Sequence, residues 1–180
     1  MKIYRLQKEY GFAELIPNDE SLDIINEGFI GKPMKDDWNI PKMQWNLEES
    51  DIIGNFSFLA GLIPVINKNA LEKLDKLITE ECIELLPIAI NNEKYFALNL
   101  LNIKSDILNI KKSKLEYFED NSIMHINEYV FNDIGVEPIF KISQLTTHIF
   151  VTNVFKNIIE KEKLTGINFI DCKVKSKRWF

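Results

Sequence analysis

The spacing of apolar residues predicts helices and strands most clearly after residue 64. Between residues 67 and 78 apolar side chains recur every three or four positions, which is the period of one helix face, and Asn67 is placed to cap the first turn. Residues 85–90 and 95–101 are apolar runs joined by a short polar segment, a pattern typical of a β-hairpin. Because Pro87 has no N–H, we expect its strand to lie near a sheet edge or a bulge.

The last third of the chain continues this alternation of strands and helix. Alternating residues predict a strand over 123–131, and shorter apolar runs predict strands at 138–142, 148–151 and 167–170. Thr152 is placed to cap a second amphipathic helix, for which Gly166 is a natural terminating residue. Since these elements follow no βαβ rhythm and no repeat, the sequence predicts an α+β fold with a mixed or antiparallel sheet and two amphipathic helices.

The first 60 residues differ in both pattern and charge. Turn-forming residues divide them into short segments, so we expect an irregular N-terminal third of short strands and loops. This third holds 6 Lys or Arg against 11 Asp or Glu, whereas residues 61–180 hold 16 of each, so the whole net charge of −5 arises here. We therefore expect residues 1–60 to form an irregular acidic segment packed on the same domain as an α+β core over residues 61–180.

Tryptophans and acids alternate within this acidic segment. A large ring flanked by carboxylates can anchor a protein interface, because the ring supplies contact area and the charge steers a basic partner. The alternatives are tryptophans packed at the edge of the core and acids that only solvate the surface. The hypothesis places a binding patch within residues 19–51, on Asp36, Asp37, Trp38, Trp45, Glu48, Glu49 and Asp51.

Tests for catalytic and metal-binding motifs fail. Gly31-Lys32 follows Gly28 too closely for a phosphate-binding loop, and Pro33 stands where that motif needs Ser or Thr. The two histidines, His125 and His148, have no zinc-ligand spacing. We therefore predict a non-enzymatic binding protein without cofactor or metal and with no catalytic residues, and an enzyme of unknown reaction class using His125 or His148 stays open as the alternative.

The compartment follows from the cysteines and from hydropathy. Cys82 and Cys172 are 90 positions apart and lack any paired-cysteine motif, which favours two reduced thiols in a cytoplasmic protein. Charges at Arg5 and Lys8 interrupt any signal peptide, and the most apolar stretch, residues 56–66, is too short to cross a membrane. The acidic balance also argues against a nucleic-acid partner.

A set of ordered segments resembles a known family, the immunity protein eleven family of bacterial polymorphic toxin systems. The segments are short, and their order and spacing carry the likeness over about two thirds of the chain. Asn67 replaces the Ser usual at the first helix, and Asn109 stands where the family generally has Asp. The matching segments are residues 54–56, 64–71, 84–87, 95–101, 138–141, 149–156 and 164–167.

This resemblance implies a cytoplasmic protein that binds a cognate toxin domain and blocks its activity as a stoichiometric inhibitor. The matching positions are mostly apolar or turn residues, so the resemblance transfers no catalytic site. The partner is expected to be a basic protein domain, with neither nucleic acid nor membrane involved. A structural or self-associating module without a toxin partner is the remaining alternative, and the oligomeric state is left open.

Overall fold

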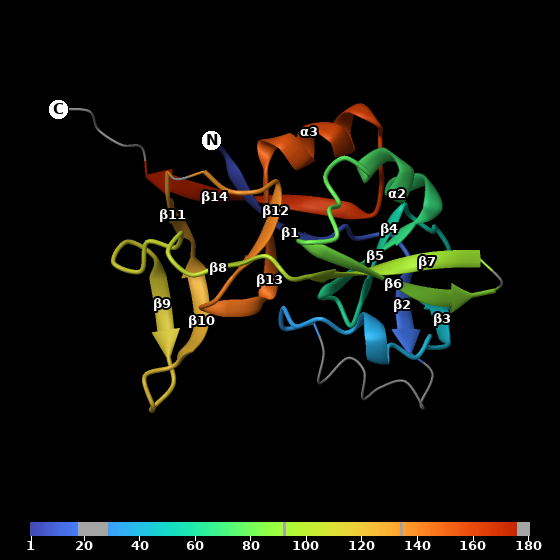
Figure 1. Ribbon diagram of the computed structural model, residues 1–180, viewed down its shortest axis with the longest axis horizontal. Coiled ribbons are helices and arrows are strands. Elements are labelled where there is room, and N and C mark those ends of the chain that lie inside the picture. The colour runs from blue at the N-terminus through green and yellow to red at the C-terminus, as the bar shows by residue number, and fades with distance from the viewer. Residues whose placement is uncertain (18–28, 92, 134, 176–180) are drawn as a thin grey trace.

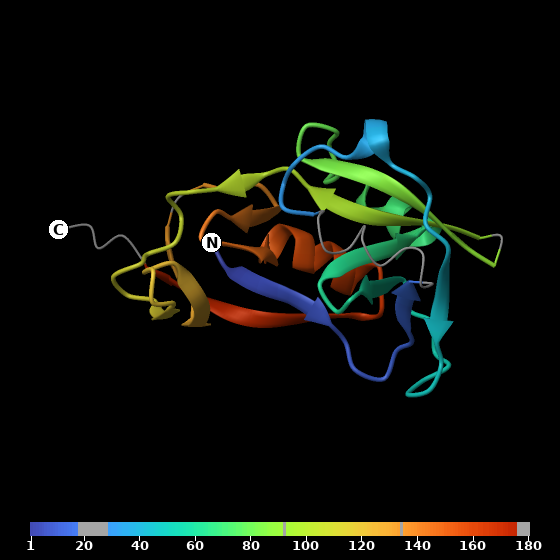
Figure 2. The ribbon, with the colours of Figure 1, turned by 90° about the horizontal axis from the view of Figure 1, so that it is seen from below.

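The computed structural model describes residues 1–17, 29–91, 93–133 and 135–175, which form two curved six-stranded sheets and a separate hairpin (Figures 1 and 2). The first sheet runs, in spatial order, β11 (Val130–Asn132), β14 (Ile167–Lys175), β1 (Ile3–Lys8), β13 (Leu145–Thr152), β12 (Ile139–Ile142) and β8 (Ile103–Lys104). The second runs β3 (Met43–Asn46), β2 (Glu14–Pro17), β4 (Phe56–Leu59), β5 (Ile63–Asn67), β7 (Glu93–Leu100) and β6 (Ile83–Ile90).

Both sheets are mixed, since each combines antiparallel pairs with a parallel one such as β12 beside β8 or β2 beside β4. The described residues also contain two α-helices, α2 (Lys68–Leu74) and α3 (Asn153–Lys161), and the 3₁₀ helix η2 (Lys35–Asp37). The predicted α+β class with mixed sheets and two helices is confirmed in this broad form, although the protein is mostly β. The expected hairpin is β6 paired with β7, and Pro87 lies on the last strand of its sheet.

The two helices begin at the predicted residues. The side chain of Asn67 accepts a hydrogen bond from the N–H of Ala70 at 2.9 Å, and Thr152 accepts one from the N–H of Val154 at 3.3 Å. Each cap satisfies a backbone donor that the first helical turn leaves without a partner. Both N-terminal predictions are therefore confirmed.

The end of the second helix is placed differently from the prediction. Helix α3 stops at Lys161, and Lys163 adopts the left-handed conformation at φ 53°. Gly166, also at positive φ, meets another constraint: a Cβ there would lie 2.1 Å from the carbonyl oxygen of Phe56. This glycine therefore allows the start of β14 to approach β4 closely, rather than ending the helix.

The prediction of a single strand over residues 123–131 is wrong. The structure divides it at Tyr129 into β10 (Ile123–Glu128) and β11, which belong to different sheets. Strand β10 pairs with β9 (Lys114–Tyr117) to form a hairpin that projects at one end of the molecule (Figure 1). Sequence alternation does not show this break, because the apolar pattern continues through a change of partner strand.

Three apolar clusters lie in the described residues: a larger one, a smaller one, and a third, the smallest, around Phe131 and Phe150. The larger cluster lies between the two sheets and under α2 and α3, and it joins residues such as Tyr4, Phe56 and Phe155. The smaller one lies on the other face of the second sheet, whose outer strands β3 and β6 approach each other at a bridge between Lys42 and Ala89. Strands from the first 60 residues take part in both sheets, with β1 between β13 and β14.

Candidate functional site

The five acids of the predicted patch are exposed, and they lie in two groups. Asp36 and Asp37 belong to η2, whereas Glu48, Glu49 and Asp51 follow β3. Figure 2 shows η2 and the turn after β3 at opposite ends of an extended segment. Within the residues that the structure describes, none of these five carboxylates forms a salt bridge. Residues 19–28 of the predicted region lie outside the described residues.

The two tryptophans of the patch pack against the smaller apolar cluster. The ring N–H of Trp38 donates to the carbonyl of Pro87 at 2.9 Å, and its ring packs edge-on against Phe29 at 6.1 Å between centroids. Trp45 packs in the same manner against Tyr95 at 5.5 Å. Both rings are half-buried, so each contributes to the core edge while part of its surface remains accessible.

A carboxylate from β6 holds the segment that carries Trp38. Glu84 accepts hydrogen bonds from the backbone N–H groups of Met34 at 2.8 Å and Lys35 at 3.3 Å. The buried side chain of Asn99 donates to both Glu84 and the carbonyl of Lys32, each at 2.8 Å. Sequence reasoning missed both residues, because Glu84 precedes the predicted strand 85–90 and its backbone partners lie 50 and 49 positions away.

The histidines differ in environment. His148, on β13, is hydrogen-bonded through Nδ1 to the Tyr129 hydroxyl, and burial, with a smaller effect of Arg5, lowers its pKa to about 4. His125 is exposed on β10. Neither histidine lines the cavity beside Lys141 or the one beside Lys8. Within those residues, no carboxylate or thiol is hydrogen-bonded to His148, so the geometry expected of the enzymatic alternative is not present there.

The cysteines are free thiols in half-buried positions. Burial raises the pKa of Cys172 to about 12, so its sulfur stays protonated and a poor nucleophile at neutral pH. Cys82 packs against the larger apolar cluster and Cys172 against the residues around Phe131 and Phe150. Both cysteines therefore pack as small apolar residues.

The β9–β10 hairpin presents a second acidic surface, which we call the hairpin tip and define as residues 116–125. Its apolar side chains are unusually exposed: Tyr117 at 50%, Phe118 at 54% and Met124 at 44% of their maximum. It carries three acids, Glu116, Glu119 and Asp120, and no Lys or Arg. Sequence reasoning missed the hairpin tip because residues 114–117 form a short strand without a clear alternating pattern.

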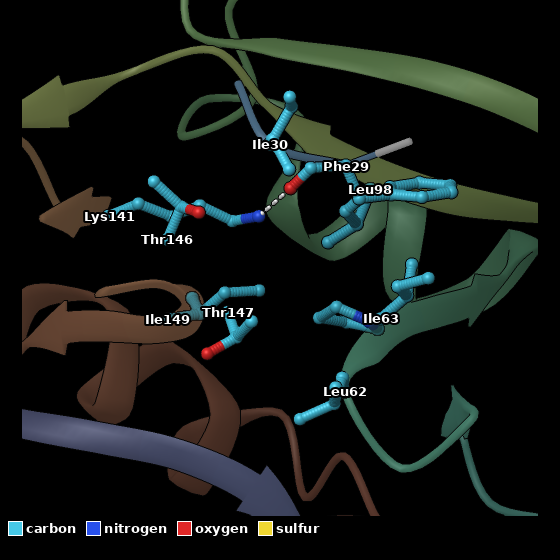
Figure 3. A pocket seen from close by; sticks show the side chains of 10 residues that line it. Phe29, Ile30, Leu62, Ile63, Leu98, Lys141, Thr146, Thr147 and Ile149 are labelled. Atoms are coloured by element: carbon cyan, nitrogen blue, oxygen red, sulfur yellow. Dashed lines mark hydrogen bonds between the residues drawn. The ribbon is translucent and has the colours of Figure 1, made fainter. Parts of the chain in front are cut away.

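A cavity of about 140 Å³ lies where β5 and β7 of one sheet face β12 and β13 of the other. Figure 3 shows Lys141 extending along its margin, with its ammonium group donating to the carbonyl oxygen of Phe29. Leu62 and Ile63 lie across the space from Thr147 and Ile149 (Figure 3). Lys141 is only 4% exposed, and burial lowers its pKa to about 8.

Two features are absent from the described residues. No group of three or more His, Cys, Asp or Glu side chains is arranged there to hold a metal ion. The helices of that part of the chain are all too short or too polar to span a membrane.

In the comparison with family models, residues 89–174, from the end of β6 to the end of β14, match the family described as Immunity protein family (Imm11). The resemblance stated from the sequence is thereby confirmed over these residues, and it indicates an immunity role. The match includes the hairpin tip and Lys141, whereas residues 36–51 lie outside it. A search of curated proteins finds no match.

Proposed function

We propose that the protein is an immunity protein that binds a cognate bacterial toxin domain in the cytoplasm and neutralises it as a stoichiometric inhibitor. The observation that carries this proposal is the family match over residues 89–174. A stoichiometric inhibitor needs a rigid scaffold and an interface of roughly 1,600 Å² rather than a catalytic constellation. The well-packed sheets supply such a scaffold, and the exposed acids supply charge for a basic partner.

We further propose that Asp36, Asp37, Trp38, Trp45, Glu48, Glu49 and Asp51 contribute to toxin binding. Their carboxylates are exposed and, within the described part of the chain, form no salt bridge, so their field is available to attract a basic surface. The separation of the two acidic groups favours steering over a single contact. The exposed parts of the two rings lie between these groups along the chain.

The immunity role predicts that a toxin domain is encoded beside the gene for this protein, and that domain provides the test of function. We expect that expression of that domain alone arrests bacterial growth and that co-expression of this protein restores it. Titration of the purified toxin should end at one equivalent of the protein, with a complex of matching mass in light scattering. Continued growth arrest would contradict neutralisation, and full inhibition at a small fraction of an equivalent would indicate an enzyme instead.

The surface is tested separately by charge reversal. Variants Asp36→Lys with Asp37→Lys, and Glu48→Lys with Glu49→Lys, should each slow association about tenfold at low salt and less at high salt. The matched control is Glu80→Lys with Glu81→Lys, because these two acids are also adjacent and exposed but precede β6. Equal rates for all three variants would contradict the site while leaving neutralisation intact.

The module without a toxin partner makes a different prediction. It would associate with itself at micromolar concentration and leave the growth arrest unchanged. Sedimentation of the protein alone, together with the co-expression assay, separates this alternative from the immunity role.

A further inference from the structure

The cavity beside Lys141 combines a buried cation with apolar walls. Its lining comes from segments far apart in the sequence: Phe29 and Ile30, strands β5 and β7, and strands β12 and β13. Most of the lining side chains are aliphatic, and Thr146 and Thr147 add two hydroxyl groups. A space of about 140 Å³ is close to that of cavities that accept a benzene-sized molecule, so it can hold roughly six non-hydrogen atoms.

Lys141 is the charged group of this cavity. Its side chain is almost wholly buried, and the hydrogen bond that the structure shows for its ammonium group is to a neutral carbonyl, that of Phe29. An ammonium group has three donors, so this bond uses only part of its capacity. Within the described residues, Lys141 forms no salt bridge.

A neighbouring lysine shows the contrast. Lys104 lies on β8, the strand that pairs with β12, and it forms a salt bridge with Glu137 at 2.7 Å. A buried charge is costly unless an opposite charge compensates it. Lys104 has that compensation from within the chain and is also less buried, whereas Lys141 faces a cavity large enough to admit the compensating group from outside.

We propose that the cavity binds a carboxylate on a short aliphatic stem, with Lys141 pairing the carboxylate and the aliphatic walls enclosing the stem. The carboxylate can belong to a free short-chain acid or to an acidic side chain of a bound protein, since both carry the same chemistry. A hydroxyl of Thr146 or Thr147 can donate a further hydrogen bond to the second carboxylate oxygen. This site does not depend on the proposed immunity function.

Butanoate, which has six non-hydrogen atoms, is the direct probe, with butanamide as its uncharged control. We expect saturable binding of butanoate with a dissociation constant on the order of 1 mM. The NMR shifts of the Ile63 and Ile149 methyl groups, which line the cavity, measure this binding. Butanamide should bind at least tenfold more weakly. Pairing with a carboxylate should also raise the pKa of Lys141 from about 8 towards 10.5, measured on the labelled side-chain carbon.

Three variants locate the site. Lys141→Met should abolish butanoate binding, whereas Lys104→Met should leave it unchanged. Leu62→Trp should narrow the cavity and weaken binding while Lys141 is retained, and Leu62 tolerates a larger side chain because it is 47% exposed. This last variant tests the site even if the substitution of Lys141 impairs folding.

A blocked glutamate, with both backbone ends capped, distinguishes the two sources of the carboxylate. Binding of butanoate alone assigns the cavity to free acids, and binding of both probes shows that an acidic side chain of a partner can also enter. The inference is overturned if neither probe saturates below about 100 mM, if butanamide binds as well as butanoate, or if Lys104→Met has the same effect as Lys141→Met.

Discussion

In the segment 36–51 the carboxylates are exposed while the tryptophan rings pack against the core, whereas at the hairpin tip both acids and aromatic rings are exposed. Trp38 is held by Phe29 and by the Pro87 carbonyl, but Phe118 is 54% exposed. Both regions combine acids with aromatic residues in sequence. Their difference shows that this combination does not by itself predict an anchor residue, because the ring must also be free of the core.

The two regions are also anchored differently. The segment with η2 is held by hydrogen bonds to Glu84 and Asn99. The β9–β10 hairpin joins the first sheet at Tyr129, whose hydroxyl is hydrogen-bonded to His148. The first anchor uses a charged acceptor and the second a neutral pair. These anchors and the two kinds of aromatic residue provide four ways to test the comparison.

The largest effect is expected from removing a packed ring of the segment 36–51. Trp38→Ala should lower the free energy of unfolding by about 3 kcal/mol, because it empties a packed position and removes the bond to the Pro87 carbonyl. Denaturant titration measures this change. Trp38→Phe, which keeps most of the packing, should cost less than half as much, and a change below 0.5 kcal/mol for Trp38→Ala would contradict the packing account.

Acid should weaken the anchor beside the hairpin. The pKa of His148 is about 4 in the folded protein against an ordinary value of 6.5, so between these values the unfolded chain binds a proton that the folded chain does not. The free energy of unfolding should therefore fall as the pH decreases, with a contribution of about 2.5 kcal/mol from His148 between pH 7 and pH 4.5.

Replacing each histidine by glutamine, which does not titrate, provides the control for this pH effect. His148→Gln keeps an acceptor for the Tyr129 hydroxyl and should remove most of the acid dependence over that range. His125→Gln, at the exposed histidine of β10, should leave it nearly unchanged. Equal slopes for both variants would show that His148 is not the group responsible.

A smaller loss is expected at the charged anchor of the segment 36–51. Glu84→Gln replaces one of the two carboxylate oxygens by an NH₂ group, so at least one of the donors from Met34, Lys35 and Asn99 loses its acceptor. The free energy of unfolding should fall by about 1–2 kcal/mol. Hydrogen exchange should show faster opening at the Met34 and Lys35 amides. The matched change Glu93→Gln, on the neighbouring strand β7, should leave both amides as protected as before.

The smallest effect on stability is expected at the hairpin tip. Phe118→Ala should change the free energy of unfolding by less than about 0.5 kcal/mol, because the ring is largely exposed. Its effect on toxin affinity then shows whether the hairpin tip joins the interface. A loss of tenfold or more would add the hairpin tip to the proposed surface, and no loss would leave residues 36–51 as the better-supported contact.

Local patterns in the sequence were sufficient for several elements. The caps at Asn67 and Thr152 and the β6–β7 hairpin depend on residues within a few positions of one another, which is why they are readable from the chain. The end of α3 and the strand around Tyr129 were predicted wrongly. At Tyr129 a change of partner strand, and not the local pattern, determines where β10 stops. Helix α3 instead ends in a local turn, where Lys163 is left-handed and the N–H of Leu164 donates to the carbonyl of Ile159, while Gly166 is required by the approach to Phe56.

The family resemblance, the acidic first third and the helix starts therefore come from the sequence alone, because composition and short-range spacing are properties of the chain itself. The tertiary structure decided which aromatic rings are exposed, which carboxylates gather and where Lys141 lies. Phe29 and Lys141 are 112 positions apart, yet they share one hydrogen bond beside one cavity. Burial and charge pairing of this kind arise only when distant strands pack together, so no local pattern can reveal them.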